Sequence, residues 1–176
     1  MPNLNSKHSI SEEFKNQALD LLNQSMIKIN NCFDQLSEEQ IWWSPVDSAN
    51  SIGNLILHSC GNLRQWGITG IQKSQDTRHR EAEFLADSRV SKTELLELCK
   101  VTIREFRHVV RSLTEAVLLA ERIIQNFRVT VLQAILHTTT HFAGHTHQII
   151  MLTRRQLGKN YQFAWQPDEG QNELPL

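Results

Sequence analysis

Long stretches of this sequence repeat their apolar residues at the spacing of an α-helix, and few residues interrupt them. Only seven glycines and four prolines occur in 176 residues. Segment 11–36 carries one apolar stripe, and Ser11 followed by two acidic residues is typical of a helix start. Segment 91–114 carries another stripe, and the spacing of Ser91 and Glu94 is that of a capping box. Both segments are therefore predicted to be amphipathic helices.

Two further segments keep the helical period. Segment 51–72 should form the second helix, although it contains four glycines that cost about 1 kcal/mol each relative to alanine. We expect these glycines to allow close helix contact or to make room for another group; they are Gly53, Gly61, Gly67 and Gly70. Segment 129–156 should form the fourth helix and end at Gly158.

The remaining stretches are connections and show no strand pattern. Residues 37–50 are predicted to be a loop with a short helical turn, residues 74–90 a polar connection, and residues 115–127 a less regular stretch. The prediction is an all-α four-helix bundle in a single domain, 1–176, with its core at about 10–158 and an irregular tail at 159–176.

Composition and charge limit the partners. A net charge of -1 and a pI near 6.7 argue against a nucleic-acid binder. The sequence has no apolar run long enough to span a membrane and no apolar N-terminal stretch to act as a signal peptide. Three dispersed cysteines fit reduced thiols rather than a disulfide framework. We therefore expect a cytoplasmic protein with neither a nucleic-acid nor a membrane partner.

Four of the eight histidines lie between His137 and Gln148, inside a segment that otherwise reads as a buried helix. Positions four apart share one helix face, so His137, His141 and His145 form a ridge with Gln148 beside it. His147 falls on another face and is predicted to be exposed or to contact a second copy. Burying several imidazoles without partners is costly, and a divalent metal ion would accept their lone pairs.

A third ligand should come from another helix, and His58 is the only histidine deep inside an apolar stretch of the second helix. Asn54 and Asn62 lie one turn to either side of it and could orient it or contact a ligand through hydrogen bonds. The alternative is that these histidines are ordinary core residues that form hydrogen bonds to one another. Spacing alone leaves the two interpretations open.

Three motifs carry a resemblance to a known group of proteins. They are "SIGNLILHSCGNLRQW" at 51–66, "RHREAEF" at 78–84 and "HTTTHFAGHTHQII" at 137–150. In this order they resemble the DinB/YfiT-like superfamily, over about residues 10–158. The resemblance implies an up-down-down-up four-helix bundle, a homodimer, and a metal site that holds zinc or nickel. Carried over by position, the ligands are His58, His141 and His145, with His137 as a neighbour or an alternative ligand.

The resemblance also implies a chemistry. Characterised members of the superfamily use a low-molecular-weight thiol, and a metal ion with an open position can bind a thiol and stabilise the thiolate. No serine, cysteine or carboxylate in the sequence has a spacing that indicates another nucleophile, and Cys60 is predicted to be packed in the core. One departure is His147, which stands where relatives tend to have glycine and puts the local packing in doubt.

Other residues receive mainly structural interpretations. Arg64 could bind an anionic substrate group, but an ion pair is favoured, and Trp66 is expected in the core. The charges of "RHREAEF" are expected to pair within the connection or to fix it to the bundle. Trp42 and Trp43 should cover the end of the bundle or line a dimer interface.

Three hypotheses follow. The leading one is a metal-dependent thiol S-transferase that acts on a small-molecule substrate. The second is a non-catalytic bundle that binds a metal or a ligand, for example in a stress response. The third is a structural dimer module whose histidines satisfy one another.

Overall fold

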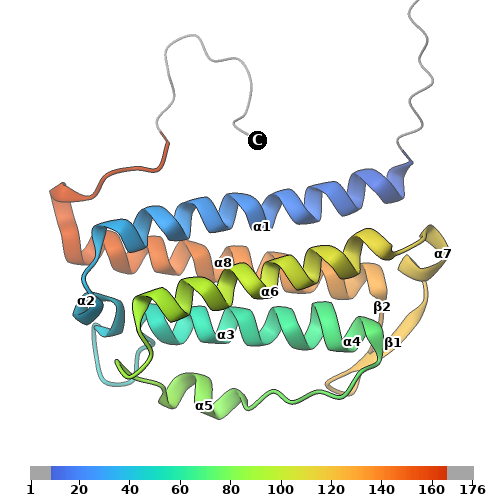
Figure 1. Ribbon diagram of the computed structural model, residues 1–176, viewed down its shortest axis with the longest axis horizontal. Helices are drawn as coiled ribbons and strands as arrows, with labels where there is room; N and C mark the ends of the chain where they lie inside the picture. Colours follow the sequence, from blue (N-terminus) through green and yellow to red (C-terminus); the bar gives the residue numbers. More distant parts are fainter. Residues whose placement is uncertain (1–8, 166–176) are drawn as a thin grey trace, which may run out of the picture.

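Four long helices form the computed structural model, which describes residues 9–165 (Figure 1). They are α1 (Ile10–Gln35), α3 (Ile52–Arg64), α6 (Lys92–Ser112) and α8 (Val131–Leu157). Figure 1 shows α1 and α8 running in one direction and α3 and α6 in the other. Because α3 and α6 are parallel, the chain between them must return along the length of the bundle. The predicted all-α, up-down-down-up bundle is confirmed.

Each long helix begins at a hydroxyl side chain that accepts a hydrogen bond from a backbone N–H of its first turn. Ser91 and Glu94 form the predicted capping box of α6. The first helix begins earlier than expected, because Ser9, and not Ser11, accepts the bond from the Glu12 amide, at 3.2 Å. The prediction of Ser11 as the N-cap was wrong by two residues, since both serines precede the same acidic pair.

The second predicted helix is interrupted by a wider turn. After α3, residues Gln65–Thr69 form the π-helical turn η1, and α4 (Gly70–Gln72) completes the segment. The chain then leaves the helix at Lys73, whose φ of 58° is left-handed. Such π turns accommodate one extra residue and are frequent at functional sites.

The glycines of this segment lie where another chain element approaches closely. A Cβ at Gly53 would come within 2.6 Å of the Trp42 ring, and a Cβ at Gly67 within 2.5 Å of the Phe106 ring. The expectation of close contact at these glycines is therefore confirmed. Trp42 covers the first turn of α3 and donates from its indole to the Val90 carbonyl at 2.9 Å.

Short elements complete the fold. The short helical elements are α2 (Glu38–Trp42), α5 (Arg80–Leu85), α7 (Glu115–Leu118) and the 3-10 turn η2 (Gly158–Asn160). The stretch expected to be irregular contains a β-hairpin, in which β1 (Glu121–Ile124) pairs antiparallel with β2 (Phe127–Thr130). The prediction that the chain contains no strand was wrong here. The strands are only four residues each, and their turn, Gln125 and Asn126, lacks the glycine that usually marks a hairpin.

The core lies between the four helices and includes the predicted stripes. Cys60, Cys99 and Trp66 are buried, as expected for Cys60 and Trp66. Among residues 9–165, no helix is long and apolar enough to cross a bilayer. The predicted irregular tail begins within η2, while its residues 166–176 and the N-terminal residues 1–8 lie outside the described part of the chain.

Candidate metal centre

Three histidines from two helices meet at one edge of the bundle. His58 comes from α3, and His141 and His145 come from successive turns of α8. The Nε2 atom of His141 lies 3.2 Å from Nε2 of His58 and 3.2 Å from Nε2 of His145. Their ligand atoms all fall within 4.8 Å of one another. We call these three residues the histidine cluster.

The hydrogen bonds behind two of these rings determine which nitrogen faces the cluster. His58 Nδ1 lies 3.0 Å from the Glu83 carboxylate, and His145 Nδ1 lies 2.8 Å from the Gln148 amide oxygen. Both partners are acceptors, which favours a proton on both Nδ1 atoms when the rings are neutral. Arg78 Nη2 also lies 3.1 Å from His58 Nδ1, but it has acceptors of its own in the Glu83 carboxylate at 2.8 Å and the His58 carbonyl at 3.4 Å. The Nε2 lone pairs of both rings consequently point toward His141.

His141 lies between these two rings, and a neutral His141 ring cannot donate a hydrogen bond to both of their Nε2 lone pairs. Its own Nε2–H could donate to only one lone pair, and its buried Nδ1 has no hydrogen-bond partner among the described residues. Burial, and after it the positive charges that His145 and His58 can carry, together lower the pKa of His141 to about 3. His141 is therefore uncharged near neutral pH.

This arrangement fits a bound cation. Two nitrogens that each lie 2.0–2.1 Å from a zinc ion at a tetrahedral angle are roughly 3.4 Å apart. The two 3.2 Å separations are close to that value. The residues present therefore offer the donor atoms, the protonation state and the spacing that a divalent metal requires.

A buried ion pair supports His58 from behind. Arg78 Nε and Nη2 donate to the two oxygens of Glu83 at 2.7 and 2.8 Å, and the same carboxylate accepts from His58. The Arg78 and Glu83 side chains are only 6% and 11% exposed. Burial alone would raise the pKa of Glu83, but the hydrogen bonds from Arg78 and His58 outweigh it and lower the pKa. Glu83 is therefore an anionic anchor for the His58 ring.

Gly61 makes this anchor possible. It follows His58 by less than one helical turn, and a Cβ at this position would overlap the Glu83 carboxylate. The charges of "RHREAEF" thus pair within the connection and also fix it to α3, as expected. Sequence reasoning did not find that Glu83 contacts His58. The available signal was Gly61, about one helical turn after the candidate ligand His58, since a glycine there leaves room for another group beside that ligand.

The side chains of the two α3 asparagines form hydrogen bonds with other segments of the chain. Among the described residues the Asn54 side chain forms no hydrogen bond with the His58 ring; its amide donates to the carbonyls of Glu83 and Ala86, at 3.0 and 3.1 Å, and so holds the chain segment that carries Glu83. Asn62 accepts a hydrogen bond from Thr138 of α8 at 2.9 Å. Arg64 points away from the cluster and forms the favoured ion pair, with Glu105 at 2.6 Å.

His137 stands apart from the cluster. Its ring packs on Trp66 with a centroid separation of 4.1 Å and lies 6.0 Å from the His141 ring. Since no imidazole bond joins it to the other three, its position is that of a neighbour rather than a ligand. His147 is exposed, as one of the two alternatives predicted, and its Nδ1 lies 2.8 Å from the Ala143 carbonyl.

Two ridges therefore face each other across a seam between α3 and α8. His58, Asn62 and Trp66 follow at intervals of four on one side, and His145, His141 and His137 do so on the other. The histidine cluster lies at one end of the seam, and the Trp66–His137 pair at the other.

A cavity of about 550 Å³ opens along this seam beside the cluster. We call it the seam cavity. Its lining residues are His58, Asn62, Trp66, Arg78, Arg80, Gln125, Phe127, Arg128, Val129, Gln133, His137 and His141.

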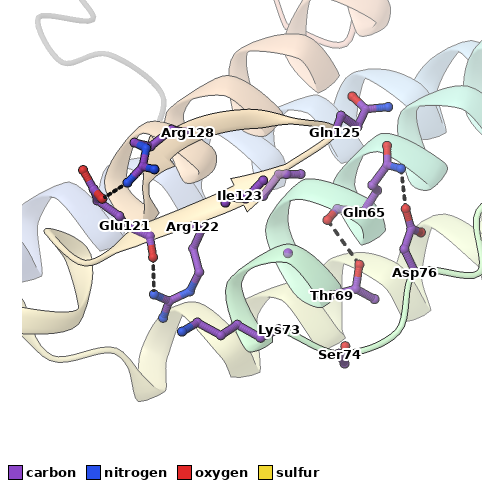
Figure 2. A pocket seen from close by; sticks show the side chains of 12 residues that line it. Gln65, Thr69, Lys73, Ser74, Asp76, Glu121, Arg122, Ile123, Gln125 and Arg128 are labelled. Atoms are coloured by element: carbon purple, nitrogen blue, oxygen red, sulfur yellow. Dashed lines mark hydrogen bonds and ion pairs between the residues drawn. The ribbon is translucent and has the colours of Figure 1, made fainter.

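A second cavity, of about 570 Å³, lies between the hairpin and the end of the second helix, away from the cluster (Figure 2). Several of its charged groups have partners: Arg128 pairs with Glu121 at 2.9 Å, and Asp76 accepts a hydrogen bond from the Gln65 amide at 2.5 Å. Figure 2 shows both pairs on its wall. It contains none of the three clustered histidines.

The fold and this site define a class: a DinB-like helical bundle with a three-histidine group that could hold a metal ion. A structure of a conserved protein from Enterococcus faecalis is 15% identical with a TM-score of 0.70, covering 82% of this chain and 97% of that one. DinB-like proteins from Bacillus cereus and Bacillus subtilis are 13% and 16% identical, with TM-scores of 0.67 and 0.61. Each covers 86% of this chain, and 95% and 99% of its own.

The sequence model of a family described as "Protein of unknown function (DUF1572)" matches residues 9–168. The chain belongs to this DinB-like family, which confirms the resemblance to the DinB/YfiT-like superfamily. No curated protein matches the chain.

Proposed function

We propose that this protein is a metal-dependent enzyme of the thiol S-transferase type, in which His58, His141 and His145 hold a divalent zinc or nickel ion. The observation that carries the proposal is the convergence of three Nε2 atoms on one place. In His58 and His145, the hydrogen bonds of Nδ1 favour the tautomer whose Nε2 lone pair faces this place. A small cation satisfies such a group without adding protons that would repel one another.

When bound, the ion would supply Lewis acidity that lowers the pKa of a low-molecular-weight thiol and stabilises its thiolate. The side chains of this protein have supporting tasks. Glu83 keeps the proton on Nδ1 of His58, and Gln148 does the same for His145, so that both rings present Nε2. Such partners typically change metal affinity 10- to 100-fold.

The lining of the seam cavity supports an external nucleophile. Among the described residues it contains no serine, threonine, cysteine, lysine, aspartate or glutamate. Cys60 is buried against Cys99, with 3.5 Å between the sulfur atoms, and lies on the other side of α3. A transferred group would therefore have to be attacked by a molecule that enters the cavity, which is what a thiol cosubstrate provides.

Metal content and turnover test the proposal together. Protein purified without chelators should contain about one zinc or nickel per chain, and a variant with both His141→Ala and His145→Ala should contain none. The wild type should also transfer at least one thiol of a panel to an aryl halide, and the variant should not. Wild-type protein without metal would refute the proposal. Metal binding without turnover for any thiol would instead favour a non-catalytic metal-binding bundle.

We further propose that the chain forms a homodimer in the cytoplasm. Large apolar side chains are exposed on α1 and α8, among them Ile27 (58%) and Met151 (58%). The three cysteines are free thiols, which suits a reducing compartment. Sedimentation analysis should give twice the mass of the 20.3 kDa chain, and a monomer at micromolar concentration would refute the dimer.

A further inference from the structure

The seam cavity has an unusual balance of charge. Three arginines and no carboxylate line it among the described residues. Arg78 is neutralised by Glu83, but Arg80 has no hydrogen bond or ion pair to any residue in 9–165 and lies over the Phe84 ring at 5.0 Å. Arg128 pairs with Glu121 in a contact where the side chains are 71% and 62% exposed. An ion pair so exposed contributes only about 0–1 kcal/mol, so Arg128 can exchange its partner for a ligand.

The side-chain amide of Asn62, on the wall of the same cavity, has a hydrogen-bond partner for its oxygen but none for its nitrogen among the described residues. Asn62 is only 5% exposed, and its Oδ1 accepts from Thr138. Its Nδ2 donates to no described residue, although the side chain lines the cavity. This nitrogen is not among the fully buried side-chain atoms that lack a partner, so it is accessible from the cavity and free to donate there. The position therefore suits an oxygen acceptor on a bound molecule.

Flat side chains form the apolar part of the wall. Trp66 packs on His137 on one side, and its ring centroid lies 6.3 Å from that of Phe127 on the hairpin. The Trp66 indole also donates to Gln125 of the hairpin turn at 3.0 Å, which fixes the ring in place. Rigid aromatic walls of this kind favour flat apolar ligands.

We propose that the seam cavity binds the substrate of this enzyme, and that the substrate is a flat apolar molecule bearing an oxyanion group, a carboxylate or a phosphate. The proposal rests on the proposed function, because the cavity is a substrate site only if the adjoining cluster holds the metal. Arg80 and Arg128 bind the oxyanion, since guanidinium groups match the two oxygens of such a group. Asn62 donates to a second oxygen nearer the cluster, and Trp66 and Phe127 contact the flat body.

Binding of small probes tests this assignment. Benzoate, phenyl phosphate and the neutral benzamide are titrated into the purified protein by calorimetry, both metal-loaded and after chelator treatment, because a carboxylate can also bind a metal directly. Wild-type protein in both forms should bind one of the two anions at least about 10-fold more tightly than benzamide. The preferred anion identifies the oxyanion as carboxylate or phosphate.

Arginine variants locate the contact. Arg80→Gln and Arg128→Gln should each weaken anion binding about 5- to 10-fold and leave benzamide binding unchanged. Arg89→Gln is the matched control, because Arg89 lies on the same connection as Arg80, is 85% exposed and does not line the cavity. Equal affinity for anions and benzamide would overturn the assignment, as would an equal loss in the control variant.

Metal content of the same samples separates this inference from the proposed function. Protein that holds metal but does not prefer the anions refutes the substrate class and leaves the metal enzyme intact. Protein that prefers the anions in an arginine-dependent manner but holds no metal refutes the proposed function, and with it the role of the cavity as a substrate site.

Discussion

The support of His58 by Glu83 leads to a quantitative prediction for Glu83→Gln. The substitution keeps the shape of the side chain and removes the charge. Arg78, 6% exposed, then loses its anionic partner and retains the Gln65 amide oxygen at 2.9 Å. Breaking a buried pair from one side costs about 3–5 kcal/mol. Because glutamine still offers one acceptor oxygen, we expect the free energy of unfolding to fall by about 2–3 kcal/mol.

Two measurements follow. For a chain of this size about 1 kcal/mol corresponds to about 2–4 °C, so calorimetry of the metal-free variant should show a Tm lower by about 4–12 °C. Competition against a chromophoric chelator should show zinc affinity lowered 10- to 100-fold, because the Nδ1 proton of His58 is no longer held by a charge.

Glu105→Gln is the matched control. Glu105 also pairs with an arginine, Arg64 of α3, but the side chains of Glu105 and Arg64 are 42% and 39% exposed and are not part of the cluster. The Glu105→Gln substitution should lower the free energy of unfolding by no more than about 1 kcal/mol and leave zinc affinity unchanged. The reasoning is refuted if Glu83→Gln binds zinc like the wild type, or if the two variants are equally destabilised.

Two further predictions concern pH and packing. Because burial lowers the pKa of His141 to about 3, below the unfolded value of 6.5, the metal-free fold should be fully stable above about pH 6.5 and lose up to about 1.4 kcal/mol per pH unit as the pH falls toward 3. Urea unfolding between pH 7 and 4 measures this, and a slope unchanged in His141→Gln would contradict it. Gly61→Ala should displace Glu83 and weaken zinc binding at least about 10-fold. The control is Gly144→Ala, whose Cβ would meet nothing within 4 Å; its stability should rise by about 0.5–1 kcal/mol, as melting curves can show. Equal zinc affinity of the two alanine variants would count against the role of Gly61.

Helical period was enough to predict the four long helices and the ridge of histidines on α8. The hairpin was missed because its strands are four residues long and its turn residues, Gln125 and Asn126, adopt positive φ without a glycine. The π turn was missed because propensity and period describe the α-helix only.

The candidate site was predicted in part for a similar reason. Helical spacing placed His141 and His145 on one face, the apolar stretch around His58 and the family resemblance added that residue from another helix, and the structure brings the three together. The contact between His58 and Glu83 joins residues 25 positions apart through a connection of irregular structure. No periodicity describes such a segment, so only the coordinates reveal it.

The π turn at η1 also bears on how members of the family differ. It accommodates one extra residue between Asn62 and Lys73, and each residue of a helix turns by about 100°. A relative with a single deletion there would continue as regular α-helix and rotate every later side chain away from the hairpin. Such a protein would keep its three histidines but change the shape of the neighbouring cavity. A one-residue gap at this point of an alignment should therefore separate proteins that share a metal but accept different molecules.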